Sequence, residues 1–255
     1  MKKLILEGGN NPTSIQARGL FSFIIQYVSV HRAYFLDNEK YKIYFDLRDS
    51  SYSPHEGNHW DLFYMQEPLD DGQRTVWGDS GNLYGYSFDY QNVAERQIAQ
   101  DIIKRHLVLK PHIQKLIDDF YNSNLRGFKI LGVHKRGTDI SIHHEPASLE
   151  FFFESVDKVM HEYDRIFLST DEKRVVDAFK QRYSNVVNAS YNTLSNYSNL
   201  PNFKTNEGKS DGYQVGVEAI LDAYLLAKCD FLIKGNSNLS NFSLLANPEL
   251  EFVFI

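Results

Sequence analysis

The 255-residue chain is 42% hydrophobic and 24% charged, which is typical of an ordinary soluble globular protein with one large domain or two small ones. Its formal net charge of -6 argues against a broad electrostatic grip on nucleic acid or an anionic membrane, since both need an excess of basic residues. The single cysteine, Cys229, excludes an internal disulfide and a cysteine-based zinc site, which fits a reducing compartment.

The sequence gives no sign of export or of a membrane span. The apolar run within residues 1–9 is shorter than the core of a signal peptide, and no stretch approaches the roughly 18 apolar residues of a spanning helix. We therefore expect a cytoplasmic protein without a transmembrane segment. This leaves peripheral membrane association open, and it does not indicate an oligomeric state.

The first half of the chain predicts one β-α-β unit followed by loops. Strands at 3–6 and 41–46 flank an apolar pattern of helical period from 14 to 32. Residues 48–90 have no sustained period, so we expect loops and short elements that build the acceptor side of a site.

Helical periodicity returns from 92 to 122 and is interrupted at Pro111. The residue before a proline is pushed out of the helical region, so we expect one helix to end there, a second to begin at Pro111, and a domain boundary at this point. Beyond it, strands and helices alternate, which predicts parallel sheets. We expect strands at 130–134, 165–171, 185–187, 231–233 and 252–254, and helices at 148–163, 172–183, 217–225 and 239–246.

A buried strand with a polar end is expected around His134, Arg136 and Asp139. Ligands of open α/β sheets bind outside the carboxyl ends of strands, which favours a site here. A turn also carries polar residues simply because it faces water, so the pattern alone leaves both interpretations open. A zinc site formed by His134, His143 and His144 is a further alternative, although no helical spacing typical of zinc ligands supports it.

A second candidate is the turn Gly235-Asn236-Ser237-Asn238 between a predicted strand and a predicted helix. Backbone N–H groups at a helix N-terminus favour an anion such as phosphate, but the same residues also serve as an ordinary turn and cap. Arg136 at the end of another strand favours the phosphate interpretation, because a guanidinium binds phosphate oxygens in a bidentate manner. Together these groups would form a diphosphate clamp.

Three segments of the second half match the motifs of one known family, in order. The run His134-Lys135-Arg136-Gly137-Thr138-Asp139 is similar to a His-x-Arg-Arg-x-Asp motif, and residues 166–172 are similar to an apolar strand that ends in Thr-Asp-Asp or Thr-Asp-Glu. Residues 218–222, 229–233 and 236–240 are similar to a third motif, an acidic helix before a strand and a Ser-rich turn. From near Lys110 to the C-terminus, the chain therefore resembles GDP-fucose-dependent α1,2-, α1,6- and protein O-fucosyltransferases, including the nodulation type.

The resemblance implies an α/β fold of GT-B type, in which two Rossmann-like domains with parallel sheets face each other across a cleft. Residues 1–109 would form the acceptor-side domain and residues 110–255 the domain that binds the nucleotide sugar. The implied reaction is an inverting, metal-independent transfer of fucose from GDP-fucose to a glycan hydroxyl, with GDP as product and no required cofactor.

The resemblance also implies roles for individual residues. Arg136 would bind the β-phosphate and stabilise charge on the departing diphosphate, while His134 would contact the nucleotide. Asp222 would accept hydrogen bonds from guanine, and Ser237 with Asn238 would donate to the phosphates. The other expected binding residues are Asn236, Thr170, Asp171, Gly9 and Asn10, the last two lying where relatives have a Gly-rich loop that faces the donor.

The chain departs from the family pattern at Gly137, where a second arginine is common. One positive charge near the leaving group is therefore missing, which puts either the rate or the sugar donor in question. A general base must take the proton of the acceptor hydroxyl. Glu145 lies close to where a base occurs in some relatives, and Asp139 and His144 are its rivals.

Two functional hypotheses follow from these residues. The first is the fucosyltransferase, with a different nucleotide-sugar donor as the alternative within the same class. The second is a degenerate relative that binds a nucleotide sugar or a glycan without turnover. The expected partners are a nucleotide sugar and a glycan acceptor, with no nucleic acid, and the sequence identifies neither the acceptor nor the linkage.

Overall fold

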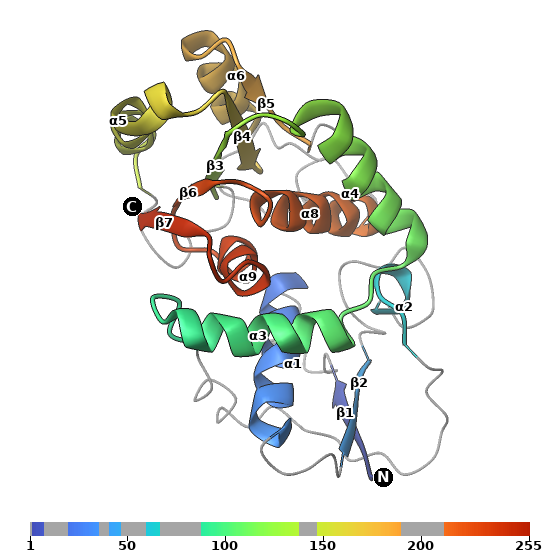
Figure 1. The fold of residues 1–255 in the computed structure, drawn as a ribbon. Coiled ribbons are helices and arrows are strands. Elements are labelled where there is room, and N and C mark those ends of the chain that lie inside the picture. Colours follow the sequence, from blue (N-terminus) through green and yellow to red (C-terminus); the bar gives the residue numbers. More distant parts are fainter. Residues whose placement is uncertain are drawn as a thin grey trace.

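The structure is a computed structural model, and it describes residues 2–7, 20–35, 41–46, 60–66, 88–137, 147–189 and 212–255. Its larger sheet consists of β3 (Ile130–Lys135), β4 (Arg165–Thr170), β5 (Val186–Val187), β6 (Phe231–Lys234) and β7 (Glu251–Phe254). The five strands are ordered β5-β4-β3-β6-β7, and every neighbouring pair is parallel (Figure 1). The predicted α/β architecture with a parallel sheet is confirmed.

The strand order reverses beside β3. The chain runs from β3 outward through β4 to β5, then crosses back to β6 on the other side of β3 and ends at β7. In open α/β sheets, ligands bind at the carboxyl ends of the strands where the order reverses. The sheet topology therefore points to the carboxyl ends of β3 and β6.

Helices cover both faces of this sheet. One face packs on α5 (Leu149–Val159), which continues into the short η3 (Met160–Glu162), and on α6 (Lys173–Arg182). The other face packs on α4 (Pro111–Asn124), α8 (Gly212–Leu226) and α9 (Asn238–Ala246). Side chains alternate along a strand. Val133 therefore packs on the face covered by α5 and α6, whereas Gly132 approaches Cys229, just after the end of α8, on the other face.

The described segments of the N-terminal half contribute a parallel pair of strands and three helices. The pair is β1 (Lys2–Glu7) with β2 (Tyr41–Asp46), and the helices are α1 (Leu20–Phe35), α2 (Trp60–Phe63) and α3 (Val93–His106). Both α1 and α3 pack against α9, and α2 packs against α8. Apolar residues of the N-terminal helices therefore share one continuous core with α8 and α9.

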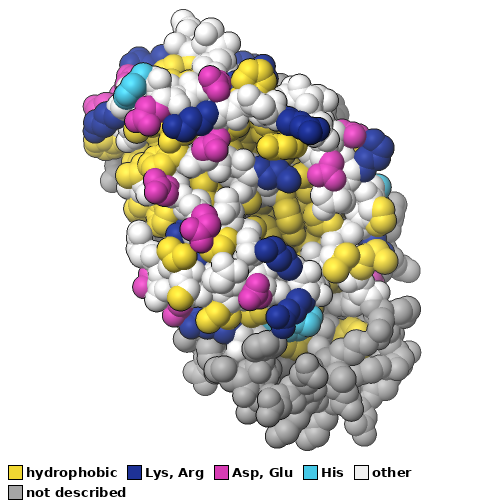
Figure 2. Space-filling model, viewed as in Figure 1, with side chains coloured by type: hydrophobic (Ala, Val, Ile, Leu, Met, Phe, Trp, Pro, Cys, Tyr) yellow, Lys and Arg dark blue, Asp and Glu magenta, His cyan; other side chains and the backbone are white. Residues whose placement is uncertain are grey.

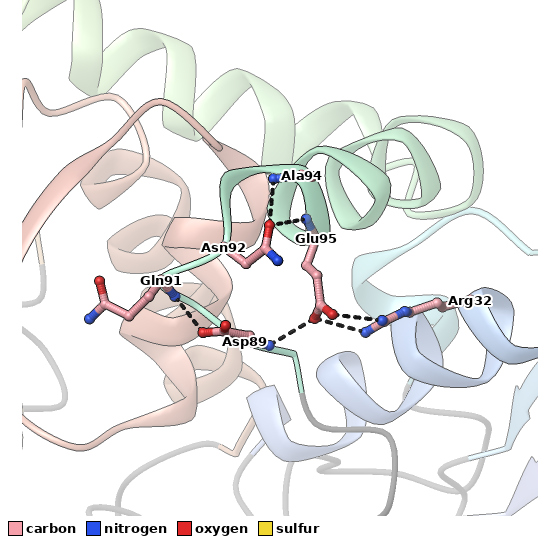
Figure 3. A network of polar contacts seen from close by, with 6 residues as sticks. All are labelled: Arg32, Asp89, Gln91, Asn92, Ala94 and Glu95. Carbon is pink, nitrogen blue, oxygen red and sulfur yellow. Dashed lines mark hydrogen bonds and ion pairs between the residues drawn. The ribbon is translucent and has the colours of Figure 1, made fainter.

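A polar network fixes the start of α3 against α1 (Figure 3). Asn92 is the N-cap, and its side-chain oxygen accepts hydrogen bonds from the backbone of Ala94 and Glu95. The Glu95 carboxylate accepts two hydrogen bonds from the Arg32 guanidinium of α1, at 3.0 and 3.1 Å, and a third from the backbone N–H of Asp89. The bidentate pair therefore ties the start of α3 to α1 with a defined geometry.

The helical pattern of residues 92–122 is split at Pro111, as predicted, because α3 ends at His106 and α4 starts with Pro111. The predicted first helix is found from Leu20 onward, and residues 14–19 lie outside the described ranges. The domain division at 109/110 stays a prediction. In the ribbon, α3 lies beside α9 although it precedes this boundary (Figure 1).

Among the described helices, none is long and apolar enough to span a bilayer. On the face shown in Figure 2, acidic and basic side chains are interspersed rather than gathered by sign. This face gives no support to a broad basic surface of the kind that binds nucleic acid.

The contact between α1 and α3 includes His31 stacked on His106, with ring centroids 4.0 Å apart. Burial, and then the neighbouring His106, lower the pKa of His31 to about 3. Below about pH 6.5 the unfolded chain therefore binds a proton at His31 that the folded chain does not bind. This difference lowers the unfolding free energy by about 2 kcal/mol at about pH 5, and it has no effect above neutral pH. Urea unfolding at about pH 7.5 and about pH 5 should show a smaller acid loss for His31→Phe than for the wild type. An equal loss in both proteins would contradict this assignment.

Candidate active site

The carboxyl end of β3 brings polar side chains of three neighbouring strands into one row. His134 of β3 is paired in register with Ser169 of β4 on one side and with Lys234 of β6 on the other. All three side chains are buried. The row crosses the point where the strand order reverses, so the sequence prediction of a site after Ile130–Lys135 coincides with the place that the topology favours.

A buried hydrogen-bond chain leads from His134 to Asp222 of α8. The Ser169 hydroxyl donates to an Asp222 carboxylate oxygen at 2.8 Å, and His134 Nδ1 lies 3.3 Å from the Ser169 oxygen. Because the Ser169 hydrogen is directed at Asp222, Ser169 accepts from His134, which makes Nδ1 the protonated nitrogen of the ring. Two predicted binding residues are thus joined by a serine that the sequence argument did not single out.

The imidazole of His134 stays neutral. Burial, and then the positive charges of Lys234, Arg136 and Lys135, lower its pKa to about 3. Its buried Nε2 has no hydrogen-bond partner among the described residues. With Nδ1 protonated, Nε2 is an acceptor, so this residue can receive a hydrogen bond from an N–H or O–H group of a ligand.

A second buried network fixes the chain just after β3. The Glu172 carboxylate, 1% exposed, accepts a hydrogen bond from Lys135 Nζ at 2.9 Å on one oxygen. Its other oxygen accepts from Nε and a terminal nitrogen of Arg174 at 2.9 and 2.6 Å. The buried charge of Lys135 is therefore compensated, and Arg174 covers the pair from the solvent side with its side chain 69% exposed.

Gly137 is the residue against which this carboxylate packs. A Cβ placed on Gly137 would lie 1.8 Å from a Glu172 oxygen, so no side chain fits unless Glu172 moves. The backbone N–H of Gly137 donates to an Asp171 oxygen at 2.9 Å, and the Glu172 N–H donates to Thr170 Oγ1 at 3.2 Å. In this structure the space that a side chain at position 137 would need is therefore filled by Glu172.

The opposite wall of the site is the start of α9. Ser237 is its N-cap, and the buried hydroxyl oxygen accepts from the backbone N–H of Leu239 at 3.3 Å. The flanking Asn236 and Asn238 are exposed. The helix N-terminus presents its partial positive charge beside the end of β6, which agrees with the predicted anion-binding turn.

The structure places most of the predicted residues at this edge of the sheet. His134, Arg136, Thr170, Asp171, Asp222, Asn236, Ser237 and Asn238 all lie in described segments that meet there. Gly9, Asn10, Asp139 and Glu145 lie outside the described residues, as do His143 and His144 of the zinc alternative. Within the described part of the chain, no group of three or more metal-ligating side chains occurs.

Sequence reasoning missed three residues that shape the site, namely Ser169, Glu172 and Lys234. Each stands at or just beyond the end of a strand that was predicted correctly, so its place at this edge of the sheet could have been inferred from the sequence. Their partners could not be read from the sequence, because these depend on the register between strands and on where α8 crosses the sheet.

The fold defined by this topology is that of GT-B fucosyltransferases. A solved NodZ α-1,6-fucosyltransferase soaked with GDP-fucose superposes with a TM-score of 0.62 at 19% identity, over 97% of this chain and 93% of that one. POFUT1 in complex with GDP gives 0.55 at 10% identity over 99% and 98%, and a mutant of Arabidopsis thaliana FUT1 with GDP gives 0.56 at 11% identity over 99% and 70%.

The family follows from the sequence itself. The family model of nodulation protein Z (NodZ) matches residues 88–254, and the chain therefore belongs to the NodZ family. A comparison with curated proteins gave no match. The family confirms the predicted resemblance to the GDP-fucose-dependent fucosyltransferases, and with it the assignment to the glycosyltransferases.

Because Gly137 lies so close to Glu172, replacing it with alanine should destabilise the protein, an effect that helix or strand propensities would not predict. Gly137→Ala should lower the unfolding free energy by about 1–3 kcal/mol, because the methyl group collides with the buried Glu172 carboxylate. Gly235→Ala is the matched control, since its Cβ would meet only Phe152 at an ordinary 3.7 Å. Urea unfolding of both variants checks the expectation, and equal stabilities would show that the Glu172 packing does not constrain this position.

Proposed function

We propose that the protein is an inverting, metal-independent transferase that moves fucose from GDP-fucose to a glycan hydroxyl. The observation that carries the proposal is the convergence of Arg136 and the N-terminus of α9 on the edge where the strand order reverses, in a chain of the NodZ family. The solved NodZ, POFUT1 and FUT1 structures of this fold hold GDP or were soaked with GDP-fucose, which supports the choice of donor.

In this proposal the diphosphate lies between Arg136 and Ser237. A guanidinium and the backbone N–H groups of a helix start both favour the negative charge that grows on the diphosphate as the bond to the sugar breaks. Asn236 and Asn238 flank the same turn and add side-chain donors. These groups supply the charge stabilisation for which other transferases use a metal ion.

The nucleoside end would be read by the buried chain of His134, Ser169 and Asp222. Asp222 is proposed to accept from guanine N–H groups, and the neutral His134 to accept through Nε2 from a nucleotide hydroxyl or N–H. Thr170 and Asp171 complete the binding edge in the proposal, in addition to the backbone contacts that they already make. Gly9 and Asn10 are proposed to face the sugar from the N-terminal half.

The chemical step is a single displacement at the anomeric carbon. The acceptor oxygen forms a bond to this carbon on the face opposite the diphosphate, the bond from the carbon to the phosphate oxygen breaks, and GDP leaves with the electron pair. A carboxylate or an imidazole takes the acceptor proton, and we propose Glu145 for this role, with Asp139 and His144 as the rival bases. Inversion of the anomeric centre follows from attack on the opposite face.

Ligand-dependent thermal stability tests the donor. GDP at about a hundred times its dissociation constant should stabilise the fold by about 2.7 kcal/mol and raise Tm by about 5–10 °C, because it binds the folded state alone. UDP, CMP and ADP at the same concentration should raise Tm much less. Stabilisation by UDP without stabilisation by GDP would contradict the fucosyl assignment.

Arg136→Ala tests the proposed stabilisation of the leaving group. Fucose transfer, followed as GDP release in the presence of an acceptor, should fall by about 100-fold or more, because charge on the diphosphate loses its bidentate partner. Arg126→Ala is the matched control, since this exposed arginine lies at the opposite end of the sheet and should leave turnover unchanged. Unchanged turnover in Arg136→Ala would remove Arg136 from the reaction.

The second candidate function is nucleotide-sugar binding without turnover, which the missing second arginine at Gly137 favours. The same GDP-release assay separates the two functions. Tight GDP binding without release from GDP-fucose, with water or with any acceptor tested, would favour the binding protein.

A further inference from the structure

Lys234 is a buried cation with no acidic partner among the residues that the structure describes. Its side chain is 2% exposed at the end of β6, and none of the ion pairs or side-chain hydrogen bonds of the described residues involves its ammonium. Its charged group faces the Phe254 ring, with 5.0 Å from Nζ to the ring centroid. An aromatic face attracts a cation but does not neutralise it, so no carboxylate of the described residues compensates the charge of Lys234.

The other buried lysine of the site shows how unusual this is. Lys135 is equally buried, and the Glu172 carboxylate pairs with it at 2.9 Å. A buried ion with no partner is costly, because the protein does not replace the water that it loses. Burial accordingly lowers the pKa of Lys234 to about 8, so that it still carries a proton in most molecules at neutral pH. A residue that costs stability in this way is expected to serve a ligand.

Lys234 also stands where an anionic ligand is expected. It is paired in register with His134 across the point where the strand order reverses, and it comes immediately before the turn into α9. Lys234 and Arg136 are both close enough to His134 to oppose protonation of its ring. Two cations therefore lie near one buried, neutral imidazole, and the start of α9 follows Lys234 after a short turn.

We propose that the Lys234 ammonium binds the diphosphate of the nucleotide sugar and supplies the second fixed positive charge of the site. The proposal rests on the proposed function and adds a binding residue to it. The proposal explains how the site can work without a second arginine at position 137. Glu172 fills the space of a side chain there, and the positive charge is supplied instead by Lys234 on the adjacent strand. Lys234 and Arg136 would then hold the diphosphate from two strands.

Lys234→Met is the direct test, since methionine keeps the length and the apolar stem of the side chain. We expect the GDP dissociation constant, measured by titration calorimetry, to rise about 10- to 100-fold, the usual effect of losing a charged hydrogen bond. The dissociation constant of guanosine should change less than about threefold, because guanosine lacks the phosphates. Without ligand, the variant should melt higher by about 3 °C or more, because an unpaired buried charge has been removed.

Lys228→Met is the control for net charge, because this exposed lysine lies before β6 at the opposite end of the sheet. It should leave the affinity for GDP unchanged. An unchanged GDP affinity in Lys234→Met, in a protein whose wild type binds GDP, would overturn the role of Lys234 and leave the proposed function intact. A wild type that binds no GDP would overturn both. A parallel loss of guanosine and GDP affinity would show that Lys234 shapes the pocket rather than binding the diphosphate, and this too would overturn the inference.

Discussion

The buried carboxylate of Glu172 is the contact on which the geometry of the site depends. It joins Lys135 at the end of β3 to Arg174 in α6 and packs directly on Gly137. Removing one partner of a buried pair leaves the other charge unpaired, which costs about 3–5 kcal/mol. The direction in which the chain leaves β3, and with it the place of Arg136, is therefore set by the second motif.

The candidate site combines low solvent exposure with several charged groups, the cations Lys135, Arg136 and Lys234 and the carboxylates of Asp171, Glu172 and Asp222. The charges of its three basic side chains and of His134 are set by different surroundings. Burial and neighbouring cations hold His134 neutral, so it does not add to the repulsion. Lys135 is neutralised by Glu172, whereas Lys234 has no carboxylate partner among the described residues and is proposed to bind a ligand. Two similarly buried lysines are thus distinguished by their partners alone.

Much of this could be predicted from the sequence because the signals are local. The apolar run of 130–133, the break at Pro111 and the cap at Ser237 each depend on a few consecutive residues, and each was found where it was expected. The family motifs then predicted that Arg136, Asp222 and Ser237 belong to one site. The side-by-side positions of these segments follow from one rule, since parallel strands end at the same edge of a sheet.

What could not be predicted depends on register and on long-range packing. Nothing local to Lys234 shows that no carboxylate of the described segments pairs with it, and nothing local to Gly137 shows that Glu172 fills its side-chain space. In the sequence, Gly137 replaces an arginine that is common in the family. The missing positive charge argued against fucose as the transferred sugar. The structure offers a different interpretation, in which a neighbouring strand presents a cation at the same edge. The proposed base at Glu145 and the loop at Gly9 stay predictions, because they lie outside the described residues.

The central claim is that the carboxyl ends of β3 and β6, with the start of α9, form one diphosphate site. A crystal structure with GDP bound tests this most directly. The account predicts phosphate oxygens within hydrogen-bond distance of Arg136, of Lys234 and of the backbone N–H groups at Ser237, with guanine beside Asp222. A diphosphate bound away from this edge, with Arg136 and Lys234 both out of contact, would contradict it.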